Sequence, residues 1–256
     1  MIIPKFMGGL GNQMFQIAAA KAHALKNNTE FKACEAGHVL PYQGFKFKKY
    51  KDSIFRNIPT IDSIPQQISR YHEPYFHYKS IPDSKDLFIV GYFQSEKYFK
   101  EYEDDIKDMF SMPKNIKEYI YEKYPRISDR SVSLHVRRGD YVNLQGYHGM
   151  PTIDYYKQAI ECVGCRDNIY MFSDDIQWCK ENFKFAQNFI KEEDYISLYM
   201  MSLCQHNIIA NSSFSWWGAW LNENQNKKVI APKKWFGPKG PKATQDIIPE
   251  RWITIE

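Results

Sequence analysis

The run VSLHVRRGDY, residues 132–141, joins an apolar segment typical of a buried strand directly to two adjacent arginines. In α/β sheets ligands bind at the carboxyl ends of the strands, and Arg137 and Arg138 are predicted to lie at such an end. The planar guanidinium suits phosphate because it offers two parallel donors and a permanent charge. Asp140 could orient an arginine or act as a base. The alternative is an Arg–Asp pair that only stabilises a turn.

Short apolar runs alternate with helix-like stretches on both sides of this segment, which is the pattern of an α/β protein. Strands are predicted at 2–6, 31–34, 87–92, 132–136, 169–172, 207–210 and 229–231. Helices are predicted at 13–26, 96–109, 114–124, 153–163, 174–182, 195–204 and 214–222. The proline-rich stretch 37–86 is expected to form irregular loops over a helix or two. The sequence YPRISD at 124–129 indicates a linker, so we predict two Rossmann-like domains, 1–129 and 130–256, facing a cleft.

The composition is that of an ordinary globular chain. Its 256 residues are 43% hydrophobic and 25% charged, which excludes a disordered or fibrous protein. The formal net charge of +4 is too small for a dedicated nucleic-acid binder and fits an anionic small ligand. Aromatic residues reach 16%, and their flat faces suit sugar or base stacking as well as a well-filled core.

Cysteine usage and the N-terminal segment indicate a cytoplasmic protein. The 5 cysteines are an odd number without the spacing of a disulfide framework, which favours a reducing compartment. Cys162 and Cys165 form one CxxC without a second pair, so two reduced thiols at a helix end are favoured over zinc. The chain has no run of about 18 apolar residues. No basic n-region precedes an apolar block at its start, which argues against a signal peptide.

The segment GGLGNQMFQ at 8–16 places glycines between a predicted strand and a predicted helix. Backbone N–H groups at such a junction meet polar or anionic ligands, which makes Gly9, Gly11 and Asn12 candidates for binding. The spacing matches neither the GxGxxG fingerprint nor the P-loop. A plain tight turn, with Asn12 as a helix N-cap, is about as well supported by the spacing.

The segment FSDD at 172–175 indicates a helix start, with Ser173 as the N-cap and two aspartates in the first turn. Asp174 and Asp175 could also bind a metal. They do not form a DxD motif, however, and no third carboxylate is near in the sequence. We therefore expect neither a metal nor a cofactor.

The segment NSSFSWWGAWL at 211–221 follows a predicted strand and opens a predicted helix. Small hydroxyl residues at a helix N-terminus can bind an anion without basic side chains. Asn211, Ser212, Ser213 and Phe214 are therefore candidates. The tryptophans of this helix fall on more than one face, which favours core packing over ligand binding.

Two lysine-rich segments, 46–51 and 227–242, are expected to be solvated faces. They also offer a weak peripheral attachment to anionic lipid headgroups at the inner face of a membrane.

Four of these segments occur in the order GGLGNQMFQ, HVRRGDY, FSDD and HNIIANSSFSWWGAWL, and VIAPKKWF follows at 229–236. In motifs and order the chain resembles the bacterial-type α-1,2-fucosyltransferases of glycosyltransferase family 11 over residues 1–236. The resemblance implies a GT-B-like α/β fold and an activity that needs no metal. It also implies inverting transfer of L-fucose from GDP-β-L-fucose to O2 of a terminal galactose, as in the synthesis of a bacterial surface glycan such as an O-antigen.

The same resemblance implies roles for residues of the C-terminal half. Arg137 is expected to neutralise the β-phosphate of the departing GDP, and Arg138 to make structural or acceptor-side contacts. Asp194 resembles the acid with which related enzymes recognise guanine, because a carboxylate can accept from both N1–H and the 2-amino group. His135 and Asp174 are expected near the nucleotide.

The remaining implied contacts divide between donor and acceptor. The residues expected to donate to the diphosphate are Ser212, Ser213 and Phe214, with Asn211 beside them. On the acceptor side, Asn12 and the backbone of 9–11, including Gly9 and Gly11, are expected to line the cleft.

The group that takes the proton from galactose O2 is left open. Asp140 is the nearest carboxylate in a matching motif, and His148 in YHGMP is a second candidate. Two other functions remain as alternatives: a metal-independent fucosyltransferase of another linkage, and a non-catalytic protein that binds a carbohydrate or nucleotide sugar. The NSSFSWWGAWL segment speaks against the first, and the intact Arg-Arg, Asp and Ser-Ser elements speak against the second.

Overall fold

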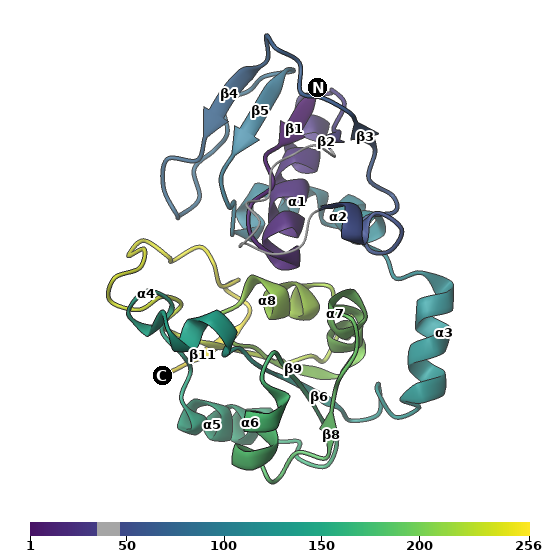
Figure 1. Cartoon of the computed structure of the whole chain (residues 1–256), viewed down its shortest axis with the longest axis vertical. Helices are drawn as coiled ribbons and strands as arrows, with labels where there is room; N and C mark the ends of the chain where they lie inside the picture. The colour runs from purple at the N-terminus through teal and green to yellow at the C-terminus, as the bar shows by residue number, and fades with distance from the viewer. Residues whose placement is uncertain (35–46) are drawn as a thin grey trace. The chain divides into compact units, whose positions relative to one another are not determined.

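The computed structural model describes residues 1–34 and 47–256, and the chain divides into two compact units (Figure 1). Unit 1 consists of residues 1–113 with 243–249, and unit 2 of residues 114–242 with 250–256. The division therefore falls earlier than the linker expected at 124–129, and a short segment near the C-terminus returns to unit 1.

Helix α3 (Lys114–Lys123) explains the position of this boundary. The Glu192 carboxylate, which is 7% exposed, accepts from the Lys123 ammonium at 2.7 Å and the Tyr124 hydroxyl at 2.7 Å. It also accepts from the Tyr119 hydroxyl at 3.0 Å. Because Glu192 lies well inside the sequence of unit 2, these bonds fix the end of α3 to unit 2.

Unit 2 is built on a six-stranded parallel sheet. Its strands are β6 (Val132–Val136), β7 (Ile169–Ser173), β8 (Asn188–Phe189), β9 (His206–Ile208), β10 (Val229–Pro232) and β11 (Ile253–Ile255). In space they follow the order β8-β7-β6-β9-β10-β11, and each pair is parallel. Counted from β6, this is the 3-2-1-4-5-6 order of dinucleotide-binding Rossmann folds. The order reverses between β6 and β9, where such sheets bind their ligands.

Helices connect these strands. They are η4 (Gly139–Val142), α4 (Gln145–His148), α5 (Ile153–Val163), α6 (Ile176–Asn182), α7 (Asp194–Leu203) and α8 (Ser213–Trp220). All five residues of β6 are buried, as expected for a parallel strand covered on both faces. The α8 residues Trp216, Trp217 and Trp220 are also buried, which confirms that they are core residues.

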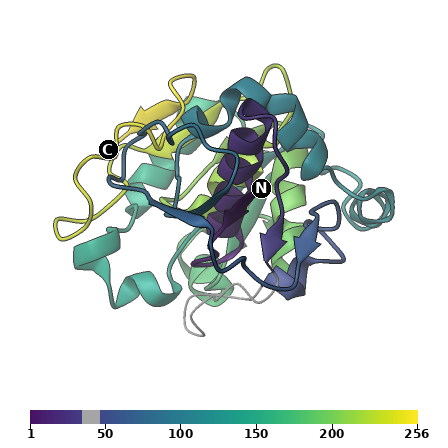
Figure 2. The same ribbon diagram turned by 90° about the horizontal axis from the view of Figure 1, so that it is seen from above.

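Unit 1 contains a second parallel α/β arrangement. Its elements are β1 (Ile2–Pro4), α1 (Leu10–Lys26), β2 (Ala33–Cys34), η1 (Phe47–Tyr50), β3 (Thr60–Ile61), β4 (Ser69–His72), β5 (Leu87–Val90), η2 (Glu96–Tyr98), η3 (Lys100–Tyr102) and α2 (Glu103–Met109). Helix α1 packs on β1 (Figure 1 and Figure 2). The sheet order is β1-β5-β4, and a parallel bridge from Ile2 to Phe31 leads to the β2–β3 pair on the other side of β1. This order also reverses next to β1, between β1 and β5.

Three expectations differ from these elements. Helix α1 starts at Leu10, three residues before the predicted start, because Gly9 serves as its N-cap in an extended conformation. The predicted helix 96–109 is two short 3-10 turns followed by α2. The stretch 37–86, expected to lack strands, contributes β3 and β4, while its residues 37–46 lie outside the described part of the chain.

Candidate active site

The predicted arginine pair lies where the strand order of unit 2 reverses. Arg137 and Arg138 follow β6, and Asn211 with Ser212 follows β9. The hydroxyl of Tyr141 donates to the Asn211 carbonyl at 3.3 Å and so links the two loops. The fold thus brings two motifs together that are about 70 residues apart in sequence.

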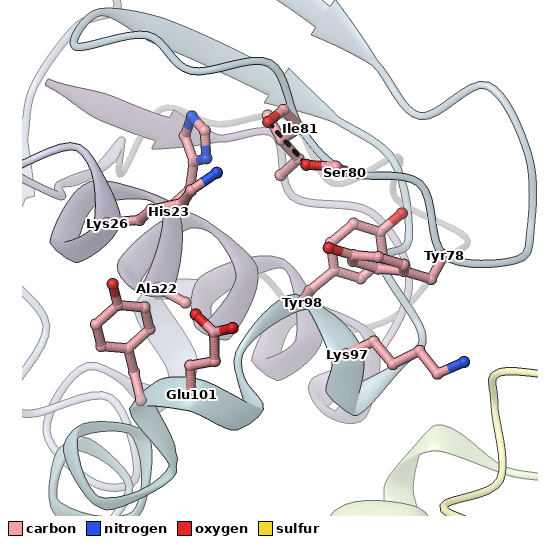
Figure 3. Close-up of a pocket in the computed structure, with 10 residues that line it drawn as sticks. Ala22, His23, Lys26, Tyr78, Ser80, Ile81, Lys97, Tyr98 and Glu101 are labelled. Atoms are coloured by element: carbon pink, nitrogen blue, oxygen red, sulfur yellow. Dashed lines mark hydrogen bonds between the residues drawn. The ribbon is translucent and has the colours of Figure 1, made fainter.

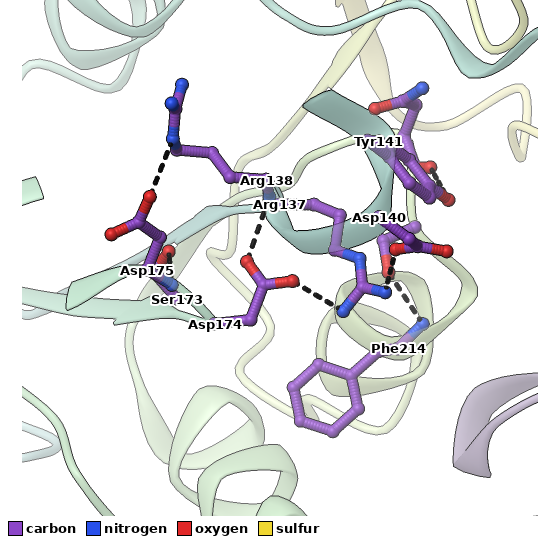
Figure 4. Close-up of polar contacts among 10 residues, drawn as sticks. Arg137, Arg138, Asp140, Tyr141, Ser173, Asp174, Asp175 and Phe214 are labelled. Atoms are coloured by element: carbon purple, nitrogen blue, oxygen red, sulfur yellow. Dashed lines mark hydrogen bonds and ion pairs between the residues drawn. The ribbon is translucent and has the colours of Figure 1, made fainter. Parts of the chain in front are cut away.

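Arg137 is held between two carboxylates (Figure 4). Its guanidinium contacts Asp140 Oδ1 at 2.5 Å and Asp174 Oδ2 at 2.7 Å, and its side chain is 33% exposed. Gly139 makes room for this arrangement: its φ is +22°, and an added Cβ would lie 2.4 Å from Asp174 Oδ2. The charge that the sequence assigned to a phosphate is therefore oriented and partly exposed, with two carboxylates as its present partners.

Arg138 has a more enclosed environment. Its Nε donates to Asp175 Oδ2 at 3.0 Å, and its guanidinium carbon lies 3.9 Å from the centre of the Trp178 ring. Its backbone N–H donates to Asp174 at 2.9 Å. These contacts hold Arg138 against α6, and its expected role, structural or on the acceptor side, stays a prediction.

The start of α6 differs from the prediction. Asp175, not Ser173, is the N-cap, and its carboxylate accepts from the Trp178 N–H at 3.1 Å. The Ser173 hydroxyl accepts from the N–H of Asp175 itself at 3.0 Å, just before the helix begins. Both aspartates of the FSDD segment thus also bind an arginine. Across residues 1–34 and 47–256, no group of three or more His, Cys, Asp or Glu side chains is arranged to hold a metal.

His135 is the fourth residue of β6 and is buried. Burial is the main cause that lowers its pKa to about 3, and the positive charge of Arg137 adds to this effect. The imidazole is therefore neutral at neutral pH. Its ring lies 5.6 Å from that of Phe214, at the start of α8, so the ends of β6 and α8 meet here.

Two aromatic rings place His148 beside this cluster. The Tyr141 and His148 rings stack with centroids 4.0 Å apart and planes 4° apart, and the Arg137 guanidinium carbon lies 5.2 Å from the Tyr141 ring centre. Burial lowers the pKa of His148, Asp140 raises it and Arg137 lowers it. A neutral imidazole can accept a proton, and the nearby Asp140 charge would stabilise the resulting imidazolium.

The loop after β9 uses its polar groups in two ways. The Asn211 amide nitrogen donates to the carbonyls of His148, Gly149 and Trp235 at 2.6–2.9 Å, which fixes the loops around it. Ser212 is the N-cap of α8, as its position before the helix suggests, and its hydroxyl accepts from the Phe214 N–H at 3.4 Å. The N–H groups at the start of α8 thus point to the same edge as Arg137.

Ser213 and Asp194 are the remaining candidates in unit 2. Ser213 is the first residue of α8. Asp194 is the first residue of α7, which follows β8, and its carboxylate accepts from the Tyr195 N–H at 2.9 Å. Both residues therefore lie at the carboxyl edge of the sheet, although Asp194 follows β8, which is two strands away from β6.

The candidates Gly9, Gly11 and Asn12 belong to unit 1. Gly11 and Asn12 lie in the first turn of α1, so Asn12 is not the N-cap. The Asn12 side-chain oxygen accepts from the Gln94 amide at 2.7 Å. Gln94 follows β5, and the sequence alone did not single it out, although it too comes just after a predicted apolar strand.

Unit 1 also contains a cavity of about 120 Å³ next to α1 (Figure 3). His23 and Lys26 line it from the helix, and Tyr78, Tyr98 and Glu101 line it from other segments of unit 1. No residue predicted from the sequence as a site residue lines this cavity.

Most lysines in 227–242 have partners within unit 2. Lys227 and Lys228 donate to backbone carbonyls, and Lys233 and Lys234 pair with Glu256 at 3.0 and 3.1 Å. Glu256 offsets one of these positive charges, whereas the hydrogen bonds to carbonyls leave the ammonium charges in place.

The lysine-rich segment 46–51 lies partly outside the described chain, since residue 46 does. Lys48 and Lys49 are exposed on η1, between the buried rings of Phe47 and Tyr50. Among the helices of 1–34 and 47–256, none has the length and apolar character to cross a membrane.

Comparison with known proteins extends over the whole chain. The family model "Glycosyl transferase family 11" matches residues 4–256. An Escherichia coli "Alpha-1,2-colitosyltransferase" is 33% identical over 100% of this chain and 99% of its own length. The "O-antigen biosynthesis glycosyltransferase WbnK" of Escherichia coli is 31% identical over 97% of this chain and 98% of its own length. "Galactoside alpha-(1,2)-fucosyltransferase 1" of Bos taurus is 25% identical over 84% of this chain and 64% of its own length.

Solved structures of low sequence identity share the fold. The fucosyltransferase NodZ from Bradyrhizobium aligns over 85% of this chain and 91% of its own, with a TM-score of 0.52 and 14% identity. POFUT1 in complex with GDP aligns over 90% of this chain and 96% of its own, with a TM-score of 0.50 and 14% identity. These neighbours confirm the expected GT-B-like α/β fold with Rossmann-like units. By the extent of the family match and the identity to the two bacterial relatives, the chain belongs to glycosyltransferase family 11.

Proposed function

We propose that this protein is an inverting galactoside α-1,2-fucosyltransferase that acts in the synthesis of a bacterial surface glycan. Arg137 carries the proposal, because it lies at the strand reversal of unit 2 with its guanidinium partly exposed. The relatives named for α-1,2-linkage and O-antigen synthesis support it.

In this mechanism, the leaving GDP takes the place of one of the two carboxylates beside Arg137, and Asp140 keeps the guanidinium oriented. Galactose O2 attacks the anomeric carbon of fucose, the bond from that carbon to the β-phosphate oxygen breaks, and GDP departs with the added negative charge. Arg137 and the N–H groups at the start of α8 stabilise that charge. Arg138 keeps the loop in place through Asp175 and Trp178.

His148 is the base that we favour. Its burial holds the imidazole neutral, so it can take the O2 proton, while Asp140 already binds Arg137 and suits the role of orienter. Asp140→Asn separates the roles. If Asp140 only orients Arg137, the variant weakens GDP affinity together with kcat and keeps the acidic limb of the pH profile. Loss of that limb with unchanged GDP affinity would make Asp140 the base.

Guanine recognition is assigned to Asp194 at the start of α7. Two guanine donors would lose their acceptor in Asp194→Ala, at a cost of about 1–3 kcal/mol. The donor KM should therefore rise with a modest change in kcat. An unchanged KM would place guanine recognition on another residue.

A donor with colitose, which is L-fucose without its 3-hydroxyl, is the second candidate. The Escherichia coli relative that is 33% identical and named an α-1,2-colitosyltransferase favours it. Competition between GDP-fucose and GDP-colitose for one galactoside, read as kcat/KM for each donor, distinguishes the two candidates. Hydrolysis of GDP-fucose with and without lactose separates both from a binding protein without activity.

A further inference from the structure

The strand order of unit 1 reverses between β1 and β5, and the loops at this point form a second polar site. We call this site the unit 1 switch point and define it as residues 5–9 after β1 and residues 91–95 after β5. Open α/β sheets bind ligands at such reversals, outside the carboxyl ends of the strands. The site differs in chemistry from the arginine cluster of unit 2, since neither loop contains an arginine.

Gln94 is the central side chain of the unit 1 switch point. It is 8% exposed, and its amide nitrogen donates to Asn12 Oδ1 at 2.7 Å, which brings the amide to the first turn of α1. Its amide oxygen is buried and accepts no hydrogen bond from residues 1–34 or 47–256. A buried acceptor without a donor is costly, so its retention needs an explanation.

The loop that carries Gln94 is held in a strained conformation. Phe93 has a φ of +51°, which is rare for a bulky residue. Glu73 fixes the loop, because its Oε2 accepts the N–H groups of Tyr92 and Phe93 at 2.8 and 3.0 Å. Its Oε1 accepts the Tyr98 hydroxyl at 3.1 Å. Strain held by three hydrogen bonds is typical of loops that present a functional side chain.

The start of α1 supplies donors beside this acceptor. Gly9 is the N-cap, no side chain caps the helix, and the first turn has no acidic residue. A Cβ built on Gly9 would have no heavy atom within 4 Å, so the backbone there borders open space. The first N–H groups of a helix have no partner within the helix and can donate to a ligand.

Donors and an acceptor side by side fit a hydroxyl group, which both accepts and donates. A phosphate would suit the helix N–H groups, but the buried amide oxygen of Gln94 would repel it. We propose that the unit 1 switch point binds a hydroxyl of the neutral acceptor sugar, with Gln94 as a specificity-determining residue and Glu73 as its positioning residue. This inference rests on the proposed function, which supplies a galactoside as the acceptor.

The test combines substitutions of Gln94 with removal of single hydroxyls from a model acceptor, as in a double-mutant cycle. The probes are methyl β-D-galactoside and its 3-, 4- and 6-deoxy analogues, measured by acceptor KM and, without donor, by saturation-transfer NMR. Gln94→Met keeps the side-chain length but removes both hydrogen bonds. Gln66→Met makes the same change at an exposed position of unit 1 and is the control.

We expect Gln94→Met to raise the acceptor KM about tenfold or more and to leave the donor KM unchanged. With the wild type, one deoxy analogue should have an acceptor KM higher than that of the parent galactoside by a similar factor. With Gln94→Met, the KM of that analogue and of the parent galactoside should be the same. Gln94→Glu, which keeps an acceptor oxygen in the same shape, should retain the wild-type penalty for that analogue. Glu73→Ala should raise the acceptor KM, and Glu73→Gln should restore it.

Equal binding of the galactoside by wild type and Gln94→Met would overturn the inference, as would deoxy penalties that are the same in both. The NMR measurement needs no turnover, so it separates the two proposals. A wild type that binds the galactoside but transfers no fucose contradicts the proposed function alone. A wild type that transfers fucose without coupling between Gln94 and any hydroxyl contradicts the further inference alone.

Discussion

At the scale of single residues, the candidate site is a set of arginines whose surroundings give them different tasks. Arg137 lies between Asp140 and Asp174 with its side chain 33% exposed, whereas Arg138 is 19% exposed and lies on the Trp178 ring. An exposed, oriented guanidinium can exchange a carboxylate for a phosphate. An arginine packed on a ring is better suited to hold the loop.

Arg137→Ala should reduce kcat by about 10²–10³, because the proposed mechanism uses no metal and has few other groups to neutralise the leaving diphosphate. Arg166→Ala, which removes an exposed arginine paired with Glu161, is the matched control and should have wild-type activity. Steady-state kinetics of both variants, with folding checked by circular dichroism, make the comparison. Near-normal turnover in folded Arg137→Ala would remove this residue from the mechanism.

His135 should make unit 2 less stable in acid. Its pKa is about 3 in the folded protein against an ordinary 6.5, so the unfolded chain binds more protons between these values. The stability that the neutral, buried His135 contributes to the fold is fully present above pH 6.5 and is lost as the pH falls toward 3. His135→Leu should therefore lose less Tm between pH 7 and about pH 5 than the wild type. Equal losses in the variant, the wild type and the exposed-site control His72→Leu would contradict this assignment.

At the scale of elements, continuous apolar runs predicted the four inner strands of the unit 2 sheet, because parallel strands buried on both faces have this pattern. The two edge strands, β8 and β11, were not predicted, because they are short and only partly buried. Strand β4 escaped detection because its sequence, SRYH, is mostly exposed at the edge of the unit 1 sheet. The start of α1 was misplaced because Gly9 caps it through backbone geometry, which leaves no side-chain signal. The motif after β6 was found from its charge, but Gln94 was not, since an amide has no such signature.

Helices α7 and α8 pack closely at Gly218. A Cβ at this position would lie 2.7 Å from the Cβ of Met201, an atom that cannot move without the backbone. Gly218→Ala should therefore cost about 1–3 kcal/mol of overpacking, which exceeds the helix propensity gained. Gly9→Ala adds the same methyl group into open space and is the control. Thermal unfolding that is the same in both variants would contradict this packing.

At the scale of the whole molecule, the sequence predicted two Rossmann-like domains but not their boundary. The linker-like composition of 124–129 was misleading, because Glu192 binds the end of α3 to unit 2. The return of 243–249 to unit 1 is held by Asp246, which accepts from the Tyr78 N–H at 2.9 Å and pairs with Lys97 at 2.5 Å. Such long-range bonds leave no trace in local composition.

Chelation should leave the activity unchanged. In the proposed mechanism, Arg137 and the start of α8 supply the positive charge that a divalent cation provides in other transferases. The measurement is the initial rate after exhaustive EDTA treatment, with and without added Mg²⁺ or Mn²⁺. Inhibition by EDTA that either cation reverses would return Asp174 and Asp175 to consideration as ligands.

The central claim is tested most directly by the linkage of the product. The purified protein is incubated with GDP-β-L-fucose and a β-galactoside, and the product is analysed by NMR. The account predicts one new α-linked fucose on O2 of the terminal galactose, together with one GDP released per fucose transferred. A fucose on another hydroxyl, a β-linkage, or release of GDP without any transfer to the galactoside would contradict it.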